Sequence, residues 1–155
     1  MKDIMRKDIY DTNFARLQKL IPDLINLKPG DYRKSQVGGF MDLNLDVLDK
    51  NDNQMIIALS HNYIQNGDVM ADPDMQIRVY LIEGWEKAEA LTYQQDNLGI
   101  YQEVYPRPGM VNPRAKKELN SFLRQWLINI KNQGHSLAKE EKPKVTDWGS
   151  EVIVI

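Results

Sequence analysis

Two segments in the middle of the chain alternate between apolar and polar residues, which predicts β-strands with one dry and one solvated face. The apolar positions of the first strand, after Gly38, are Met41, Leu43, Leu45 and Val47. The positions on one face of the second strand are Met55, Ile57, Leu59, His61 and Tyr63. The turn-forming run Asn51-Asp52-Asn53 separates them, and a hairpin about Asp52 makes the two apolar faces coincide. We therefore predict an antiparallel pair with Leu45 opposite Leu59 and Leu43 opposite His61.

Three further strands are predicted downstream, over residues 75–81, 88–95 and 100–105. Turn residues fill the segment 65–73 between the second and third strands, and we expect no strand there. Residues 31–36, which follow the Pro29-Gly30 breaker, are expected to form a loop.

A helical period replaces the alternation near both ends of the chain. The apolar positions of the N-terminal helix are Ile4, Ile9, Phe14, Leu17, Leu20 and Ile21. Asp11 or Thr12 is the expected cap of its stronger part, Pro22 stops or restarts it, and residues 22–27 are expected to form a further short turn. The second helix begins after the cap Asn112 and ends at Gly134.

The predicted fold is of the α+β class: an N-terminal helix, an antiparallel meander of about five strands, and a C-terminal helix, with the helices on one face of the sheet. The missing βαβ crossovers support antiparallel pairing. A length of 155 residues fits one domain, which we place at residues 1–135. Residues 136–155 are expected to be a flexible, charged tail whose closing EVIVI is β-prone.

Composition excludes several chemistries. The chain has no cysteine, so disulfides, zinc–thiolate sites and thiol nucleophiles are impossible. A net charge of −2 gives no general attraction to nucleic acid or anionic lipid. The charged N-terminus does not resemble a signal peptide, and no apolar run is long enough for a spanning helix, so we expect a cytoplasmic protein without a membrane partner. No nucleotide-binding or hydrolase motif occurs, and no cofactor is expected.

The densest polar stretch is HNYIQNGDVMADPDM, from His61 to Met75. This stretch contains two catalytic candidates, His61 as a general base and Asp68 as its companion carboxylate. As metal ligands it offers Asp68, Asp72 and Asp74, although Pro73 interrupts any calcium-loop spacing. The preference of asparagine, aspartate, glycine and proline for turns explains the same residues without a metal or a reaction, and we favour that interpretation.

The polar face of the predicted sheet is the main candidate for a contact surface, because tyrosine supplies contact area and a hydrogen bond together. The binding candidates on it and in the adjoining loop are Asn62, Asn66, Arg78, Tyr80, Tyr93, Tyr101 and Glu103. The final helix carries the basic residues Arg114, Lys116, Lys117, Arg124 and Lys131, which leave nucleic-acid binding as a weaker alternative.

Several short motifs resemble a bacterial family of domains of unknown function that is met in phage, plasmid and other mobile-element proteins. The motifs are HNYxQNGDxMxDPDM, YQQDxLGxYQEV and FLxxWLxNIKxQG, between about residues 38 and 135. The resemblance implies a mobile-element origin and adds no activity.

From these observations we expect a non-catalytic protein-binding or adaptor module. The alternatives are a metal-dependent hydrolase or phosphoryl-transfer enzyme using residues 61–74, and a nucleic-acid-binding accessory protein.

Overall fold

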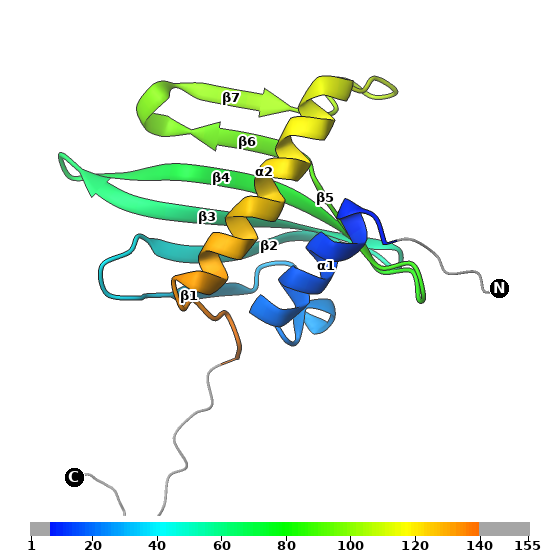
Figure 1. The fold of residues 1–155 in the computed structure, drawn as a ribbon, viewed down its shortest axis with the longest axis horizontal. Coiled ribbons are helices and arrows are strands. Elements are labelled where there is room, and N and C mark those ends of the chain that lie inside the picture. The colour runs from blue at the N-terminus through cyan, green and yellow to red at the C-terminus, as the bar shows by residue number, and fades with distance from the viewer. Residues whose placement is uncertain (1–6, 140–155) are drawn as a thin grey trace, which may run out of the picture.

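The computed structural model describes residues 7–139 of the chain (Figure 1). The elements in chain order are α1 (Ile9–Leu20), the 3-10 turn η1 (Leu24–Asn26), β1 (Tyr32–Ser35), β2 (Asp42–Lys50), β3 (Gln54–Gln65), β4 (Asp68–Tyr80), β5 (Lys87–Ala90), β6 (Thr92–Gln95), the 3-10 turn η2 (Asp96–Leu98), β7 (Ile100–Glu103) and α2 (Pro113–Asn132).

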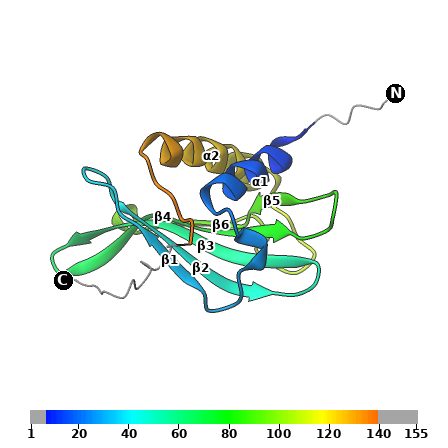
Figure 2. The same cartoon turned by 90° about the horizontal axis from the view of Figure 1, so that it is seen from below.

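One antiparallel sheet carries both helices on the same face, and the other face has no helix over it (Figures 1 and 2). The strand order is β1-β2-β3-β4-β6-β7, and β5 pairs with β4 beside this path. The α+β class and the placement of the helices are confirmed, with seven strands in the described residues instead of about five. Within residues 7–139, neither helix combines the length and apolar composition that crossing a bilayer requires.

The hairpin of β2 and β3 has the predicted register. Leu45 pairs with Leu59 and Leu43 pairs with His61, so the apolar residues of both strands face the helices. Leu43, Leu45 and Leu59 are completely buried, as expected for the dry face of a half-covered sheet. The alternation of apolar and polar residues in β2 and β3 therefore determines which side chains form the centre of the core.

The segment 31–36 is not a loop, as the sequence suggested, but contains the edge strand β1. Only Ser35 is buried in this strand, so no apolar alternation marks it in the sequence. Its backbone pairs with β2, and the Arg33 guanidinium forms an ion pair with Asp23 at 2.5 Å. Pairing partners outside the strand therefore hold β1 in place.

The prediction of turns throughout 65–73 was also wrong, because the turn needs only two residues. Asn66 and Gly67 have left-handed backbones with φ of 52° and 84°, which suits a tight hairpin turn, and β4 starts directly at Asp68. The strand pairing then shifts, because Ser60 pairs with Asp74 whereas Asn62 pairs with Ala71. Pro73 falls in this bulge, where a strand tolerates a residue without an N–H group.

The predicted fourth strand is two strands, β5 and β6, separated at Leu91. The Leu91 amide donates to the carbonyl oxygen of Gln76, and the Gln76 amide donates to Oγ1 of Thr92. β5 pairs along β4 up to Ala90, but β6 meets β4 only at Gln94 opposite Asp74. This break changes which face the later side chains occupy.

Both helices have side-chain caps. Asp8 caps α1 in place of the predicted Asp11 or Thr12, and it forms a reciprocal capping box with Asp11. Ile4 lies outside the described residues. Asn112 caps α2 as predicted, and Gly134 follows the helix with a left-handed φ of 92°.

Packing continues slightly beyond the expected end of the domain. Leu137 is 1% exposed, its amide donates to the carbonyl oxygen of Leu20, and its carbonyl oxygen accepts from Arg33. Residues 140–155 of the expected tail, including EVIVI, lie outside the described residues.

Candidate functional site

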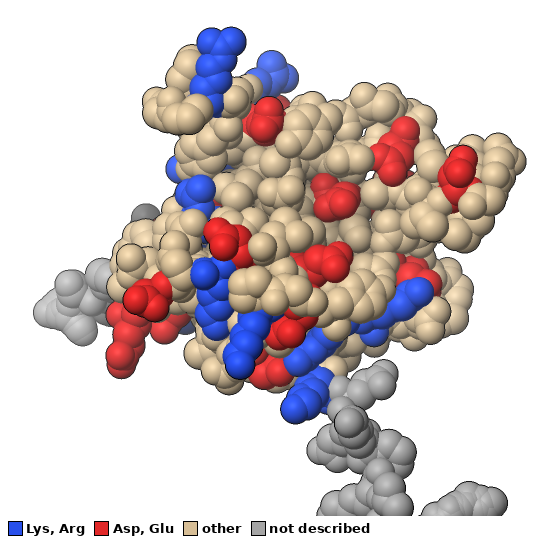
Figure 3. All heavy atoms as spheres, turned by 180° about the vertical axis from the view of Figure 1, so that it is seen from behind, with Lys and Arg blue, Asp and Glu red and all other residues tan. Residues whose placement is uncertain are grey.

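A shallow groove of about 460 Å³ lies on the helix-free face of the sheet, among β1, β2, β3 and β4. We call it the polar groove. It is lined by Tyr32, Lys34, Asp42, Asn44, Asp46, Ser60, Asn62, Tyr63, Ile64, Val69 and Asp74. Figure 3 shows this side of the molecule, where acidic and basic side chains are interspersed over the exposed sheet.

Hydrogen bonds fix the amide side chains at the centre of the polar groove. The Oδ1 atom of Asn62 accepts from Nδ2 of Asn44 and from Oγ of Ser60. The Tyr32 hydroxyl donates to Oδ1 of Asn44. These residues belong to β1, β2 and β3, whose register places Asn44 opposite Ser60. The sheet therefore presents a connected row of polar groups, which is preorganised for binding.

Carboxylates give the polar groove its charge. Burial raises the pKa of Asp74, and the nearby charges of Asp46 and Asp96 raise it further. Partial desolvation also raises the pKa of Asp46. Asp42 forms an ion pair with Lys34 at 3.4 Å, but Asp46 and Asp74 have no cationic partner among residues 7–139. The polar groove therefore holds two carboxylates whose charges are not compensated by described residues.

An exposed apolar pair borders the polar groove. Ile64 and Val69 are cross-strand partners next to the β3–β4 turn, and they are 67% and 66% exposed. This turn lies at the same end of the sheet as the β1–β2 loop and the β6–β7 turn (Figure 1). Exposed apolar residues in these neighbouring segments are Phe40, Met41, Leu98 and Ile100. We call this end of the sheet, with Ile64 and Val69, the hairpin end.

The structure does not bring the catalytic candidates His61 and Asp68 together. His61 lies on the helix side of β3, and its side chain is nearly enclosed, with the residue 4% exposed. Asp68 is exposed at the start of β4 and pairs with Gln65, four residues along β3 from His61. That spacing corresponds to about 13 Å along a strand. A direct proton transfer between these two side chains is thus out of reach.

His61 instead belongs to a buried aromatic cluster. Its ring lies 5.5 Å from the ring of Trp126 and 5.6 Å from that of His135, and its Nδ1 is 3.3 Å from the carbonyl oxygen of Asp42. Burial lowers the pKa of His61 and also that of His135. The Ser35 hydroxyl is 2.8 Å from Nδ1 of His135. Both histidines are therefore favoured in their neutral form.

The three aspartates proposed as metal ligands are distributed along β4 and do not converge. Asp68 is at the hairpin turn, Asp72 is in the bulge, and Asp74 lines the polar groove. Among residues 7–139, no group of three or more histidine, aspartate or glutamate side chains has the geometry to hold a metal ion.

Arg78 and Tyr80 lie in a different polar cluster, centred on Glu89. Glu89 is 3% exposed and forms ion pairs with Arg78 at 3.5 Å and with Lys116 at 3.4 Å. The hydroxyl of Tyr80 donates to Oε1 at 2.9 Å, and the hydroxyl of Tyr105 donates to Oε2. Burial raises the pKa of Tyr105, and the hydrogen bond to Glu89 raises it further. This cluster joins β4, β5 and the start of α2.

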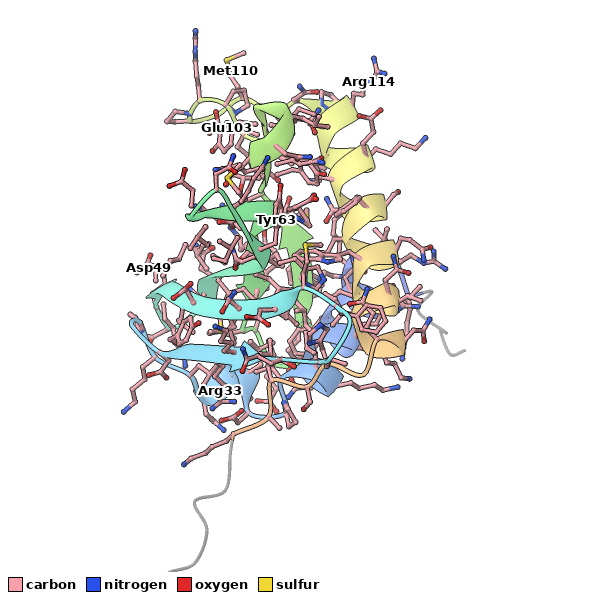
Figure 4. The ribbon with its side chains drawn as sticks, turned by 90° about the vertical axis from the view of Figure 1, so that its left-hand side faces the viewer. Arg33, Asp49, Tyr63, Glu103, Met110 and Arg114 are labelled. Carbon is pink, nitrogen blue, oxygen red and sulfur yellow. The ribbon has the colours of Figure 1, made fainter. Side chains whose placement is uncertain are left out.

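The remaining binding candidates occupy three different environments. Asn66 forms the β3–β4 turn, where its backbone is left-handed. Tyr93 lies on the helix side and not on the polar face, because the break at Leu91 shifts the alternation; its ring packs against Phe122 at 5.1 Å. Tyr101 and Glu103 are exposed on β7, and Figure 4 shows Glu103 on the side of the sheet away from α2.

The alternation of the sequence places Asp46 on the solvated face of the sheet, as the structure has it. The sequence did not indicate Ile64 or Val69 as binding residues, nor Tyr105 and Lys116 as partners of Glu89. Ile64 and Val69 were hidden because the segment 65–73 was interpreted as turns, and Lys116 meets Glu89 only through the packing of α2.

The fold and its surface define the class of this protein: an α+β domain with two helices on one face of an antiparallel sheet and an open polar groove on the other. The chain belongs to the family described as Domain of unknown function (DUF6908), whose family model matches residues 15–136. No curated protein and no solved structure matches the chain.

Proposed function

We propose that this domain is a non-catalytic protein-binding module whose polar groove receives a partner segment carrying a lysine or arginine side chain. The observation that carries this proposal is that the uncompensated Asp46 and Asp74 line the same groove as the exposed pair Ile64 and Val69. A contact surface with an apolar anchor and charged neighbours is typical of protein recognition.

The charges favour a basic partner. A cation placed near Asp74 would stabilise its ionised form, which burial and neighbouring carboxylates now disfavour. Arginine suits this role because its planar guanidinium donates several hydrogen bonds at once, to a carboxylate or to an amide oxygen such as that of Asn62. Charge complementarity would also set the orientation of the bound segment.

The apolar residues supply the other half of the interaction. Ile64 and Val69 project from adjacent strands, and covering them would remove apolar surface from water. Their position next to the turn allows a partner to contact both the hairpin end and the polar groove. The separation of His61 from Asp68 supports this role over that of a hydrolase, because the candidate base and the candidate carboxylate lie on different parts of the described sheet.

The test begins with affinity capture on the intact chain, carrying a photo-crosslinking residue in place of Val69, followed by mass spectrometry of the crosslinked peptide. We expect a reproducible partner whose crosslinked segment contains lysine or arginine. Failure to crosslink any protein reproducibly, or a crosslinked segment that is acidic, would contradict the proposal.

A matched pair of variants then tests the polar groove with the purified partner. Asp46→Asn with Asp74→Asn should weaken binding at least tenfold, on the basis of about 1.5 kcal/mol or more for hydrogen bonds to charged groups. Asp49→Asn with Asp52→Asn changes the net charge equally at residues that do not line the polar groove, and should leave affinity within about twofold. Equal losses in both variants would indicate a general charge effect and exclude the specific site.

The motif resemblance supports a further proposal, that the family originates in bacterial mobile elements. We propose separately that the protein acts in the cytoplasm. The gene neighbourhoods of family members and cell fractionation test these two points. Stable residence of the genes in chromosomal operons unrelated to mobile elements would contradict the first, and a membrane or secreted fraction the second.

A further inference from the structure

A second groove is lined by residues of α1 and α2. Figure 1 shows these two helices on one face of the sheet, and the polar groove lies on the other face. Its volume is about 490 Å³, within the roughly 300–1,000 Å³ of typical small-molecule sites. It is lined by Lys7, Thr12, Ala15, Arg16, Lys19, Leu20, Leu127, Ile128, Ile130, Lys131, Asn132 and His135. We call it the interhelical groove.

The charged residues of the interhelical groove all have the same sign. Lys7, Arg16 and Lys19 come from α1 and the residue before its cap, and Lys131 comes from the last turn of α2. No aspartate or glutamate lines the groove, and none of the four forms an ion pair within residues 7–139. A concentration of unpaired positive charge along one cleft attracts an anion.

Arg16 is the most enclosed of these cations. Its Nη1 atom is buried and has no hydrogen-bond partner among the described residues. A buried N–H group without a partner is costly, and an anionic oxygen would satisfy it. A guanidinium can also bind a carboxylate or phosphate through two parallel hydrogen bonds.

The floor of the interhelical groove is apolar. Leu20, Leu127 and Ile130 are buried in the helix-to-sheet core, and Ala15 and Ile128 flank them. Inorganic phosphate would use only the cationic rim, whereas an alkyl chain could also cover the exposed Ala15 and the half-buried Ile128 and remove their apolar surface from water. The ligand that fits both surfaces therefore has a charged head and a hydrocarbon body.

We propose that the interhelical groove binds an amphiphilic organic anion: a small molecule with an alkyl chain ending in a carboxylate or phosphate. Arg16 and Lys131, on facing helices, bind the head group. Ala15 and Ile128 contact the chain above the floor formed by Leu20, Leu127 and Ile130. This site is separate from the polar groove, so the two proposals stand or fall independently.

The direct test is a titration of the full chain with decanoate, followed by ¹H–¹⁵N NMR. We expect saturable shifts of amides along α1 and the second half of α2, with amides of the polar groove unchanged. Decanol, which lacks the charge, and inorganic phosphate, which lacks the chain, should each bind at least tenfold more weakly than decanoate, because one set of contacts is lost. A parallel titration with decyl phosphate distinguishes the two head groups.

Variants assign the head-group contact. Arg16→Gln with Lys131→Gln should raise the Kd for decanoate at least about tenfold, since two charged hydrogen-bond donors are removed. Lys117→Gln with Arg124→Gln removes the same charge from residues of α2 outside the interhelical groove, and should change the Kd by less than about twofold. Absence of saturable binding, equal binding of decanol, or equal effects of the two double variants would each overturn the proposal. Circular dichroism of both variants confirms that α1 and α2 remain folded.

Discussion

Arg78 and Glu89 face each other across the β4–β5 ladder, with Arg78 Nη1 3.5 Å from Glu89 Oε1. On the other side of the same carboxylate, Lys116 from α2 lies 3.4 Å from Oε2. The hydroxyls of Tyr80 and Tyr105 complete its hydrogen bonds. One buried carboxylate thus connects the sheet to the start of the long helix. Its negative charge compensates the partly buried cations of Arg78 and Lys116.

Removal of this carboxylate should be strongly destabilising. We predict that Glu89→Ala lowers the free energy of unfolding by about 3 kcal/mol or more, because deleting one partner of a buried ion pair leaves the others uncompensated. Urea denaturation measures the loss. The control is Glu118→Ala, which breaks the exposed i,i+4 pair with Arg114, and should cost less than about 1 kcal/mol. Similar costs for the two variants would show that the Glu89 cluster does not support the fold.

Asp74 should behave in the opposite way, because its charge destabilises the folded protein. Its folded-state pKa lies above the usual value, so stability falls as pH rises from the ordinary aspartate pKa through the folded-state pKa. We predict that Asp74→Asn raises the melting temperature at pH 7. The difference should disappear at about pH 3, below the ordinary aspartate pKa, where the carboxyl is protonated in both states. A lower melting temperature at pH 7 would contradict the assignment of Asp74 as an uncompensated charge.

The sequence predicted the strands in which the alternation of apolar and polar residues shows which face is buried. Leu43, Leu45 and Leu59 indicate which face of β2 and β3 is buried, and a short turn then allows only one pairing register. The α2 helix was predicted for a similar reason, since its cap and its terminal glycine flank a continuous apolar stripe.

Other parts depend on contacts between distant segments. β1 has no apolar pattern, and its pairing with β2 and the ion pair of Arg33 with Asp23 define it. The break at Leu91 moves Tyr93 to the helix side, a shift that no composition rule detects. The interhelical groove combines Arg16 and Lys131, which lie more than a hundred residues apart. A single sequence does not show which distant residues lie close together in the fold.

Acidification should destabilise the protein through its two histidines, the only ones in the chain. Burial lowers the pKa of both His61 and His135. As pH falls through the unfolded value of about 6.5, the unfolded chain gains protons that the folded chain does not, and stability falls. We predict a loss between pH 7.5 and 5 of at most about 1.4 kcal/mol per pH unit for each histidine.

His61→Gln tests this dependence, because glutamine keeps an N–H donor but does not titrate. Urea denaturation at both pH values should show a smaller loss on acidification than in the wild-type protein, and the double variant with His135→Gln should lose less again. The raised pKa of Asp74 makes stability depend on pH with the opposite sign, so the measurement is repeated in the Asp74→Asn background. An unchanged pH dependence in the double variant would assign the effect to other groups.

The first turn of α1 provides a last prediction, in which hydrogen bonding and charge can be separated. Asp8 Oδ1 accepts from the Asp11 amide at 2.9 Å, and its Oδ2 accepts from Lys87 Nζ at 3.0 Å. Asp8→Ala removes both contacts and should cost about 1 kcal/mol of stability, the usual value of a helix cap. Asp8→Asn keeps a capping oxygen and loses only an exposed ion pair, so it should cost a few tenths of a kcal/mol. Hydrogen exchange of the first amides of α1 should follow the same order, faster in the alanine variant and nearly unchanged in the asparagine variant. Equal costs for both variants would mean that Lys87, and not the cap, anchors this end of α1 to the sheet.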